Sequence, residues 1–143
     1  MDLKHLVAVS GLPGIFRMAA NRANGMIIED LTNGKKVFVP ARKHQFTPLE
    51  STGIYIDNGD TIELEKVFQN MMDNAGTTPP INPNSSPEEL HRYFSAILPN
   101  YDRDRVHTGD IKKVIKWYNI LGETGLLTQT PEQEDSETAK EEE

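Results

Sequence analysis

Three Asn-Gly pairs constrain the first half of this chain more than any other feature. They are Asn24-Gly25, Asn33-Gly34 and Asn58-Gly59. Asn and Gly tolerate the positive φ angles of type I′ turns, so such pairs between apolar runs predict β-hairpins. The runs around them predict five strands, at residues 6–9, 15–20, 26–31, 36–39 and 53–57. Because five short strands cannot build two packed sheets, we expect one strongly bent sheet that closes into a small SH3-like barrel.

Beyond the third pair the apolar periodicity changes from two to 3.6, which indicates helices. A first helix is expected between residues 63 and 74, covering an open side of the barrel. Ser86-Pro87-Glu88-Glu89 is typical of a capping box, so a second helix should begin there and end before Pro99. A third helix is expected over residues 109–121, and the last two helices should form a hairpin. The predicted fold class is therefore α+β.

Composition divides the chain into four segments. The barrel and its helix would occupy residues 1–73, a proline-containing linker 74–85, and a helical module 86–127. Residues 128–143 carry one lysine against seven acidic residues, which accounts for most of the net charge of −7. Such a segment cannot bury enough apolar surface to fold, so a disordered acidic tail is predicted. Its expected role is solubilising, with acidic docking as the alternative.

Several kinds of chemistry lack the residues that they need. The chain has no cysteine, which excludes disulfides, thiolate metal sites and a cysteine nucleophile. Its four histidines show no paired spacing, so no zinc site is predicted. Asp102, Asp104 and Asp110 follow part of an EF-hand spacing, but Lys113 stands where a bidentate glutamate is needed. We therefore predict no metal site, no cofactor and no catalytic residue, and expect that the protein is not an enzyme.

Neither nucleotide binding nor a membrane is indicated by the sequence. Gly11-Leu12-Pro13-Gly14 lacks the Lys-Ser or Lys-Thr of a phosphate-binding loop and is predicted to be a tight turn. No apolar run approaches the ~20 residues that a membrane-spanning helix needs. The N-terminal residues lack the layout of a signal peptide, so a cytoplasmic location is expected.

Two surfaces remain as candidates for binding. One combines arginine and aromatic residues around the third predicted helix, a composition favoured at protein interfaces. Its predicted contact residues are Tyr101, Arg103, Arg105, Lys112, Lys113 and Trp117. The other is a basic surface interleaved with aromatic residues, which suits single-stranded nucleic acid. Its predicted residues are Lys35, Lys36, Arg42, Lys43 and Lys116.

Several segments resemble an uncharacterised family of Bacteroidota proteins catalogued as a domain of unknown function. The resemblance rests on residues 10–17, 34–36, 54–57, 98–113 and 117–119. It covers residues 1 to about 123, and its most specific part is Pro99-Asn100-Tyr101-Asp102-Arg103-Asp104-Arg105-Val106. It implies a cytoplasmic bacterial protein with a small N-terminal barrel and a C-terminal helical part, and it carries over no functional residue.

The expected function is a protein-interaction or adaptor module, because no catalytic constellation is predicted and the candidate surfaces are suited to binding. RNA or DNA binding through the basic surface is the alternative. The sequence leaves the partner and the oligomeric state open.

Overall fold

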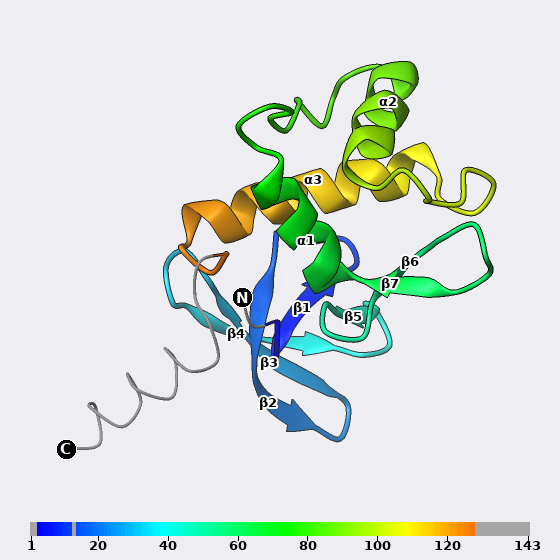
Figure 1. Cartoon of the computed structure of the whole chain (residues 1–143). Coiled ribbons are helices and arrows are strands. Elements are labelled where there is room, and N and C mark those ends of the chain that lie inside the picture. The colour runs from blue at the N-terminus through cyan, green and yellow to red at the C-terminus, as the bar shows by residue number, and fades with distance from the viewer. Residues whose placement is uncertain (1–2, 13, 128–143) are drawn as a thin grey trace.

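The computed structural model describes residues 3–12 and 14–127 of the chain. Within these residues the fold has an antiparallel five-stranded sheet, a two-stranded sheet and three helices (Figure 1). The strands are β1 (Leu6–Val9), β2 (Phe16–Arg22), β3 (Gly25–Asp30), β4 (Lys36–Pro40), β5 (Phe46–Pro48), β6 (Gly53–Tyr55) and β7 (Thr61–Glu63). The helices are α1 (Leu64–Asp73), α2 (Pro87–Ile97) and α3 (Thr108–Glu123). The predicted α+β class is confirmed.

The large sheet has the order β4-β3-β2-β1-β5, so β2, β3 and β4 form a meander and β5 returns beside β1. The five strands predicted from the sequence correspond to β1, β2, β3, β4 and β6. The prediction lacked β5 and β7, which, like β6, have three residues each, too few for an alternating pattern alone to identify them. Both strands form through pairing with another strand: Phe46 of β5 pairs with Val9 of β1, and Glu63 of β7 pairs with Gly53 of β6.

The Asn-Gly pairs lie at hairpin turns, but not in the expected type I′ conformation. Among the described residues only His5 has a positive φ angle without being glycine, so none of the three asparagines adopts one. Gly34 and Gly59 do, with φ angles of 72° and 90°. Gly25 instead begins β3, where a Cβ atom would lie 2.3 Å from the carbonyl oxygen of Val39. The close approach of the neighbouring strand therefore requires glycine at this position.

The capping box at the start of α2 is formed as predicted. The backbone N–H of Glu89 donates to the Ser86 hydroxyl at 3.2 Å, and the backbone N–H of Ser86 donates to the Glu89 carboxylate at 3.4 Å. Two N–H groups that have no partner within the helix are satisfied in this way. Pro87 at the first helical position has no N–H to satisfy, which favours a helix start here.

Replacing Ser86 with alanine is expected to lower the free energy of unfolding by about 1 kcal/mol, because the N–H of Glu89 loses its partner. Urea denaturation followed by circular dichroism would measure the change. Ser85→Ala is a matched control, since the Ser85 side chain takes no part in the box. Equal losses in the two variants would contradict the assignment of the cap.

One hydrophobic core joins the large sheet to all three helices. It contains Leu6 of β1, Phe68 of α1, Phe94 of α2 and Ile115 of α3, none of them more than 1% exposed. In Figure 1 the three helices gather on one side of the strands, around this core. The segment 74–85 therefore connects helices that pack within the same core.

A smaller core lies on the other face of β1. Leu6 belongs to the main core, whereas Val7 and Val9 belong to a second cluster together with Phe16, Ile28 and Val39. Alternate residues of a strand point to opposite faces, so both faces of β1 are buried. The described strands nevertheless form no closed barrel, and β4 and β5 lie at the two ends of the sheet order. The finer predictions, the SH3-like barrel and the helical hairpin, are not confirmed.

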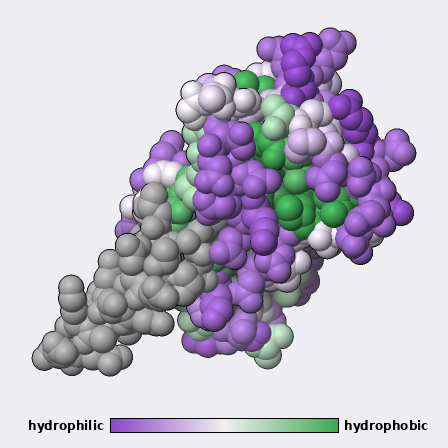
Figure 2. All heavy atoms as spheres, viewed as in Figure 1, coloured by the Kyte–Doolittle hydropathy of each residue, from purple (hydrophilic) through white to green (hydrophobic). Residues whose placement is uncertain are grey.

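The predicted acidic tail, residues 128–143, lies outside the described residues. Of the helices in the described part of the chain, none combines the length and apolar character required to cross a bilayer. Figure 2 shows a mostly hydrophilic face, with hydrophobic residues gathered above β6 and β7 and beside α1.

Candidate interaction site

The loop that joins α2 to α3, residues 98–107, is fixed to the β6–β7 hairpin and is called the connecting loop below. The backbone N–H of Asp57 donates to the carbonyl of Asn100 at 2.8 Å, and that of Asp102 donates to the carbonyl of Tyr55 at 2.9 Å. Ile56 and Tyr101 form an antiparallel bridge between these two bonds. The connecting loop therefore runs beside the end of β6 like a short additional strand.

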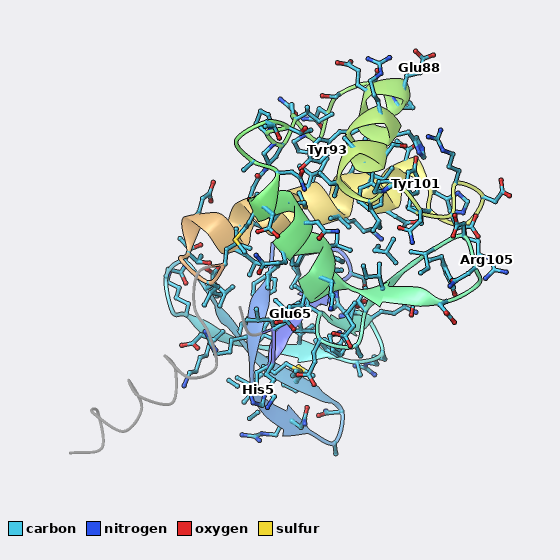
Figure 3. All side chains as sticks on the ribbon, in the orientation of Figure 1. His5, Glu65, Glu88, Tyr93, Tyr101 and Arg105 are labelled. Atoms are coloured by element: carbon cyan, nitrogen blue, oxygen red, sulfur yellow. The ribbon has the colours of Figure 1, made fainter. Side chains whose placement is uncertain are left out.

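Tyr101 anchors the connecting loop from inside. It is 4% exposed, its ring meets Phe94 edge-on at 5.0 Å, and its hydroxyl lies 2.8 Å from Nδ1 of His91. Figure 3 shows it between α2 and α3. Nε2 of His91 lies 3.2 Å from the Thr108 hydroxyl, so the imidazole links α2, the loop and α3. Tyr101 was predicted as a contact residue; its burial gives it a positioning role, and His91 is a member of the site that the sequence did not indicate.

The two arginines of the connecting loop point to different neighbours. Arg103 donates to the Ser95 hydroxyl of α2 at 2.7 Å, and its guanidinium lies 5.5 Å from the centre of the Tyr101 ring. Arg105 lies beside the β6–β7 hairpin in Figure 3, with its guanidinium 5.1 Å from the centre of the Tyr55 ring. The structure therefore separates two residues that were predicted to share one surface.

The acidic residues of the EF-hand-like pattern have structural partners. Asp102 accepts the backbone N–H of Asp104 at 2.9 Å and forms an ion pair with Arg105 at 3.7 Å. Asp110 accepts the backbone N–H of His107 at 3.0 Å and so caps α3. In the described part of the chain, no group of three or more His, Asp or Glu side chains could hold a metal ion.

A groove runs along α3 and is called the α3 groove below. It consists of two adjoining pockets, of about 220 Å³ and 320 Å³, which share Thr47 of β5 and Lys113 and Trp117 of α3. The first pocket is also lined by Tyr55, Arg105 and Asp110, and the second by the β1–β2 loop. The structure therefore brings three predicted contact residues, Arg105, Lys113 and Trp117, to one site.

The far end of the α3 groove is shaped by the β1–β2 loop. Gly11 and Gly14 have φ angles of 81° and 97°, and the backbone N–H of Leu12 donates to the carbonyl of Val9 at 3.1 Å, so the chain turns directly after β1. The Ser10 hydroxyl accepts the backbone N–H of Gln45 at 2.7 Å, and the Ser10 carbonyl lies 2.6 Å from Nδ1 of His44. These bonds hold the loop against the segment that enters β5.

The remaining predicted residues lie elsewhere. Lys112 is half-buried on α3 and lines neither pocket of the groove. The basic residues proposed for nucleic acid are exposed and lie near the two ends of β4: Lys35, Lys36, Arg42 and Lys43. Strand β4 is the edge of the large sheet opposite β5, whereas Lys116 belongs to α3, the helix that lines the groove beside β5. The sequence did not indicate Thr47, whereas Tyr55 alternates with buried Ile54 and its outward position could have been read from that pattern.

The chain is similar to two protein-family models and to one solved structure. Residues 3–49 match a domain of unknown function (DUF5606), and residues 52–121 match a second domain of unknown function (DUF6852). A solution NMR structure of a Bacteroides vulgatus protein, from the Northeast Structural Genomics Consortium, is 35% identical in sequence with a TM-score of 0.71. The alignment covers 87% of this chain and 89% of that one. This chain belongs to the same family.

The expected membership of an uncharacterised Bacteroidota family is thereby confirmed. A search of curated proteins finds no match. The first matched region ends at residue 49 and the second begins at residue 52, so the boundary between them lies between β5 and β6. The α3 groove takes residues from both regions, because Thr47 lies in the first and Trp117 in the second.

Proposed function

We propose that this family member is a non-enzymatic interaction module that binds an extended acidic segment of a partner protein in the α3 groove. The observation that carries the proposal is the placement of Lys113 and Trp117 in both pockets, opposite Thr47 of the large sheet. A cytoplasmic location remains part of this proposal, supported by the family resemblance.

The charge and ring chemistry of the groove support an acidic partner with an apolar anchor. Arg105, Lys113 and one carboxylate, Asp110, line the first pocket. Arg105 is also ion-paired with Asp102 of the connecting loop. Trp117 is half-buried, and Tyr55 is 43% exposed beneath the Arg105 guanidinium. Aromatic rings supply a large contact area at a low entropic cost, and arginine binds carboxylates in a two-pronged geometry.

The strands beside the groove support an extended partner. Strand β5 is the last strand of the large sheet, and it lines the groove at Thr47. Gly53, Ile54 and Tyr55 of β6 line the first pocket from the other sheet. Edge strands offer backbone N–H and C=O groups to a peptide that adds itself as a further strand.

The sheet itself supports a curved, SH3-like arrangement. Strand β5 returns beside β1, and the second core lies on the face of β1 that turns away from the helices. Both features fit a small bent sheet that buries its own inner face. We propose this SH3-like description, with α2 and α3 as a helical hairpin packed against it.

RNA or DNA binding is the second candidate, on a different surface. Val37 and Phe38 of β4 are 54% and 42% exposed, and Lys35 and Lys36 precede them. An exposed ring beside lysines suits base stacking and phosphate attraction. This candidate predicts an affinity for single-stranded oligonucleotide that falls steeply as salt is raised.

Selection from a random peptide library displayed on phage tests the groove proposal. The expected peptides combine Asp or Glu with an aromatic residue, and Trp117→Ala and Arg105→Gln should each weaken their binding at least tenfold. Arg92→Gln is the matched control, since Arg92 lines neither groove pocket. Selected peptides that bind both groove variants as tightly as the natural chain would refute the proposal. A single-stranded oligonucleotide that displaces them would favour the second candidate.

A further inference from the structure

A separate hollow of about 620 Å³ lies between α2 and the connecting loop, and is called the α2 pocket below. It shares no lining residue with the α3 groove. Its lining residues with polar side chains are Glu88, His91, Arg92, Ser95, Arg103 and Thr108. Its volume falls within the range of pockets that take a small organic molecule, about 300–1,000 Å³.

The positive charge at the α2 pocket is held in place. Arg103 donates to the Ser95 hydroxyl at 2.7 Å, and its guanidinium lies over the Tyr101 ring. A guanidinium carries five N–H donors, so most of them are left for a ligand after this one bond. Fixing the side chain beforehand removes part of the entropic cost of binding.

This charge has little internal compensation. The ion pairs among residues 3–12 and 14–127 are Arg17 with Glu29 and Arg105 with Asp102, so neither Arg92 nor Arg103 takes part in one. Glu88 is the one carboxylate that lines the pocket among the described residues. Two arginines against one glutamate favour a ligand that carries negative charge.

His91 gives the α2 pocket a fixed polar wall. Its two ring nitrogens lie 2.8 Å from the Tyr101 hydroxyl and 3.2 Å from the Thr108 hydroxyl. Both partners come from outside α2, so the ring cannot turn without breaking contacts to the connecting loop and to α3. Thr108 itself lines the pocket beside His91.

We propose that the α2 pocket binds a small phosphate monoester, with Arg92 and Arg103 holding its phosphoryl oxygens. A phosphate monoester carries a charge near −2 at neutral pH and three strong acceptor oxygens, which match the N–H donors of two guanidinium groups. The volume of about 620 Å³ leaves space for the organic part of the ligand beside α2. This site is independent of the α3 groove and of its proposed partner.

An NMR titration of the full chain with glycerol 2-phosphate tests the assignment, with glycerol plus sodium chloride at equal ionic strength as the reference. Saturable shifts are expected at the amides of Ser95, Arg103 and Thr108. Arg92→Gln and Arg103→Gln should each weaken binding at least tenfold, whereas Arg22→Gln, at an exposed position of β2 outside the pocket, should leave it unchanged. Because Arg103 belongs to the connecting loop and bonds it to Ser95 of α2, the exposed Arg92 provides the variant that leaves the loop intact.

Three results would overturn the proposal. The first is a set of shifts that grow linearly without saturation, or that sodium chloride reproduces. The second is equal affinity in the Arg92→Gln variant and the natural chain. The third is equally tight binding of acetate, which would show a site for carboxylates, or of inorganic phosphate alone, which would show that the organic part adds nothing.

Discussion

Replacing Phe94 with alanine is expected to lower the free energy of unfolding by about 3–5 kcal/mol. Phe94 is fully buried in the main core and meets the Tyr101 ring edge-on at 5.0 Å. The substitution removes the apolar contacts of the ring and leaves a cavity beneath the connecting loop. Urea denaturation followed by circular dichroism and by Trp117 fluorescence would measure the loss.

The same experiment examines whether sheet and helices unfold together. Leu6 and Phe94 belong to one buried cluster. The circular dichroism signal and the Trp117 fluorescence should therefore change in a single coincident transition. Phe38→Ala is the matched control, since Phe38 is 42% exposed on β4 and its removal should cost less than about 1 kcal/mol. Equal losses in the two variants, or two separated transitions, would contradict the packing described here.

The free energy of unfolding is expected to fall as the pH rises above about 10. Tyr93 is 4% exposed, and burial, with a smaller contribution from Tyr118, raises the pKa of its phenol well above the usual value. Burial also raises the pKa of Tyr118. Above pH ~10 the unfolded chain loses these protons while the folded chain keeps them, so unfolding releases protons. The contribution of Tyr93 can reach about 1.4 kcal/mol per pH unit.

Tyr93→Phe isolates this effect. The Tyr93 hydroxyl is buried and has no hydrogen-bond partner among the described residues, so its removal should also raise stability near neutral pH by ~1 kcal/mol. Denaturation curves at about pH 8 and about pH 11 should show a smaller loss for the variant than for the natural chain. Identical losses in the two proteins would show that Tyr93 does not control the alkaline transition.

The parts of the fold that could be predicted are those with local causes. The Ser86 capping box and the apolar stripe of α2 depend on neighbours within one helix, and the structure contains both. Strand β5 depends on β1, nearly forty residues earlier in the chain, and has no pattern of its own. Likewise the pair Asn24-Gly25 signals a hairpin correctly, but the need for Gly25 comes from the carbonyl of Val39 across the sheet.

The candidate site shows the same division. Residue chemistry pointed to Arg103 and Arg105, but their separation follows from the bonds between the connecting loop and β6, which no local pattern encodes. His91 lies outside the buried stripe of α2, yet it is half-buried. Its half-burial arises because Tyr101 and Thr108 fold over it from other segments. Contacts between distant segments are therefore what the sequence could not supply.

The α2 pocket and the α3 groove differ in which matched regions supply their lining residues. Every lining residue of the α2 pocket lies between Pro87 and Thr108, within the second matched region. The α3 groove, in contrast, is lined by residues of both matched regions. A substitution in the first region can therefore change the lining of the α3 groove without changing any lining residue of the α2 pocket.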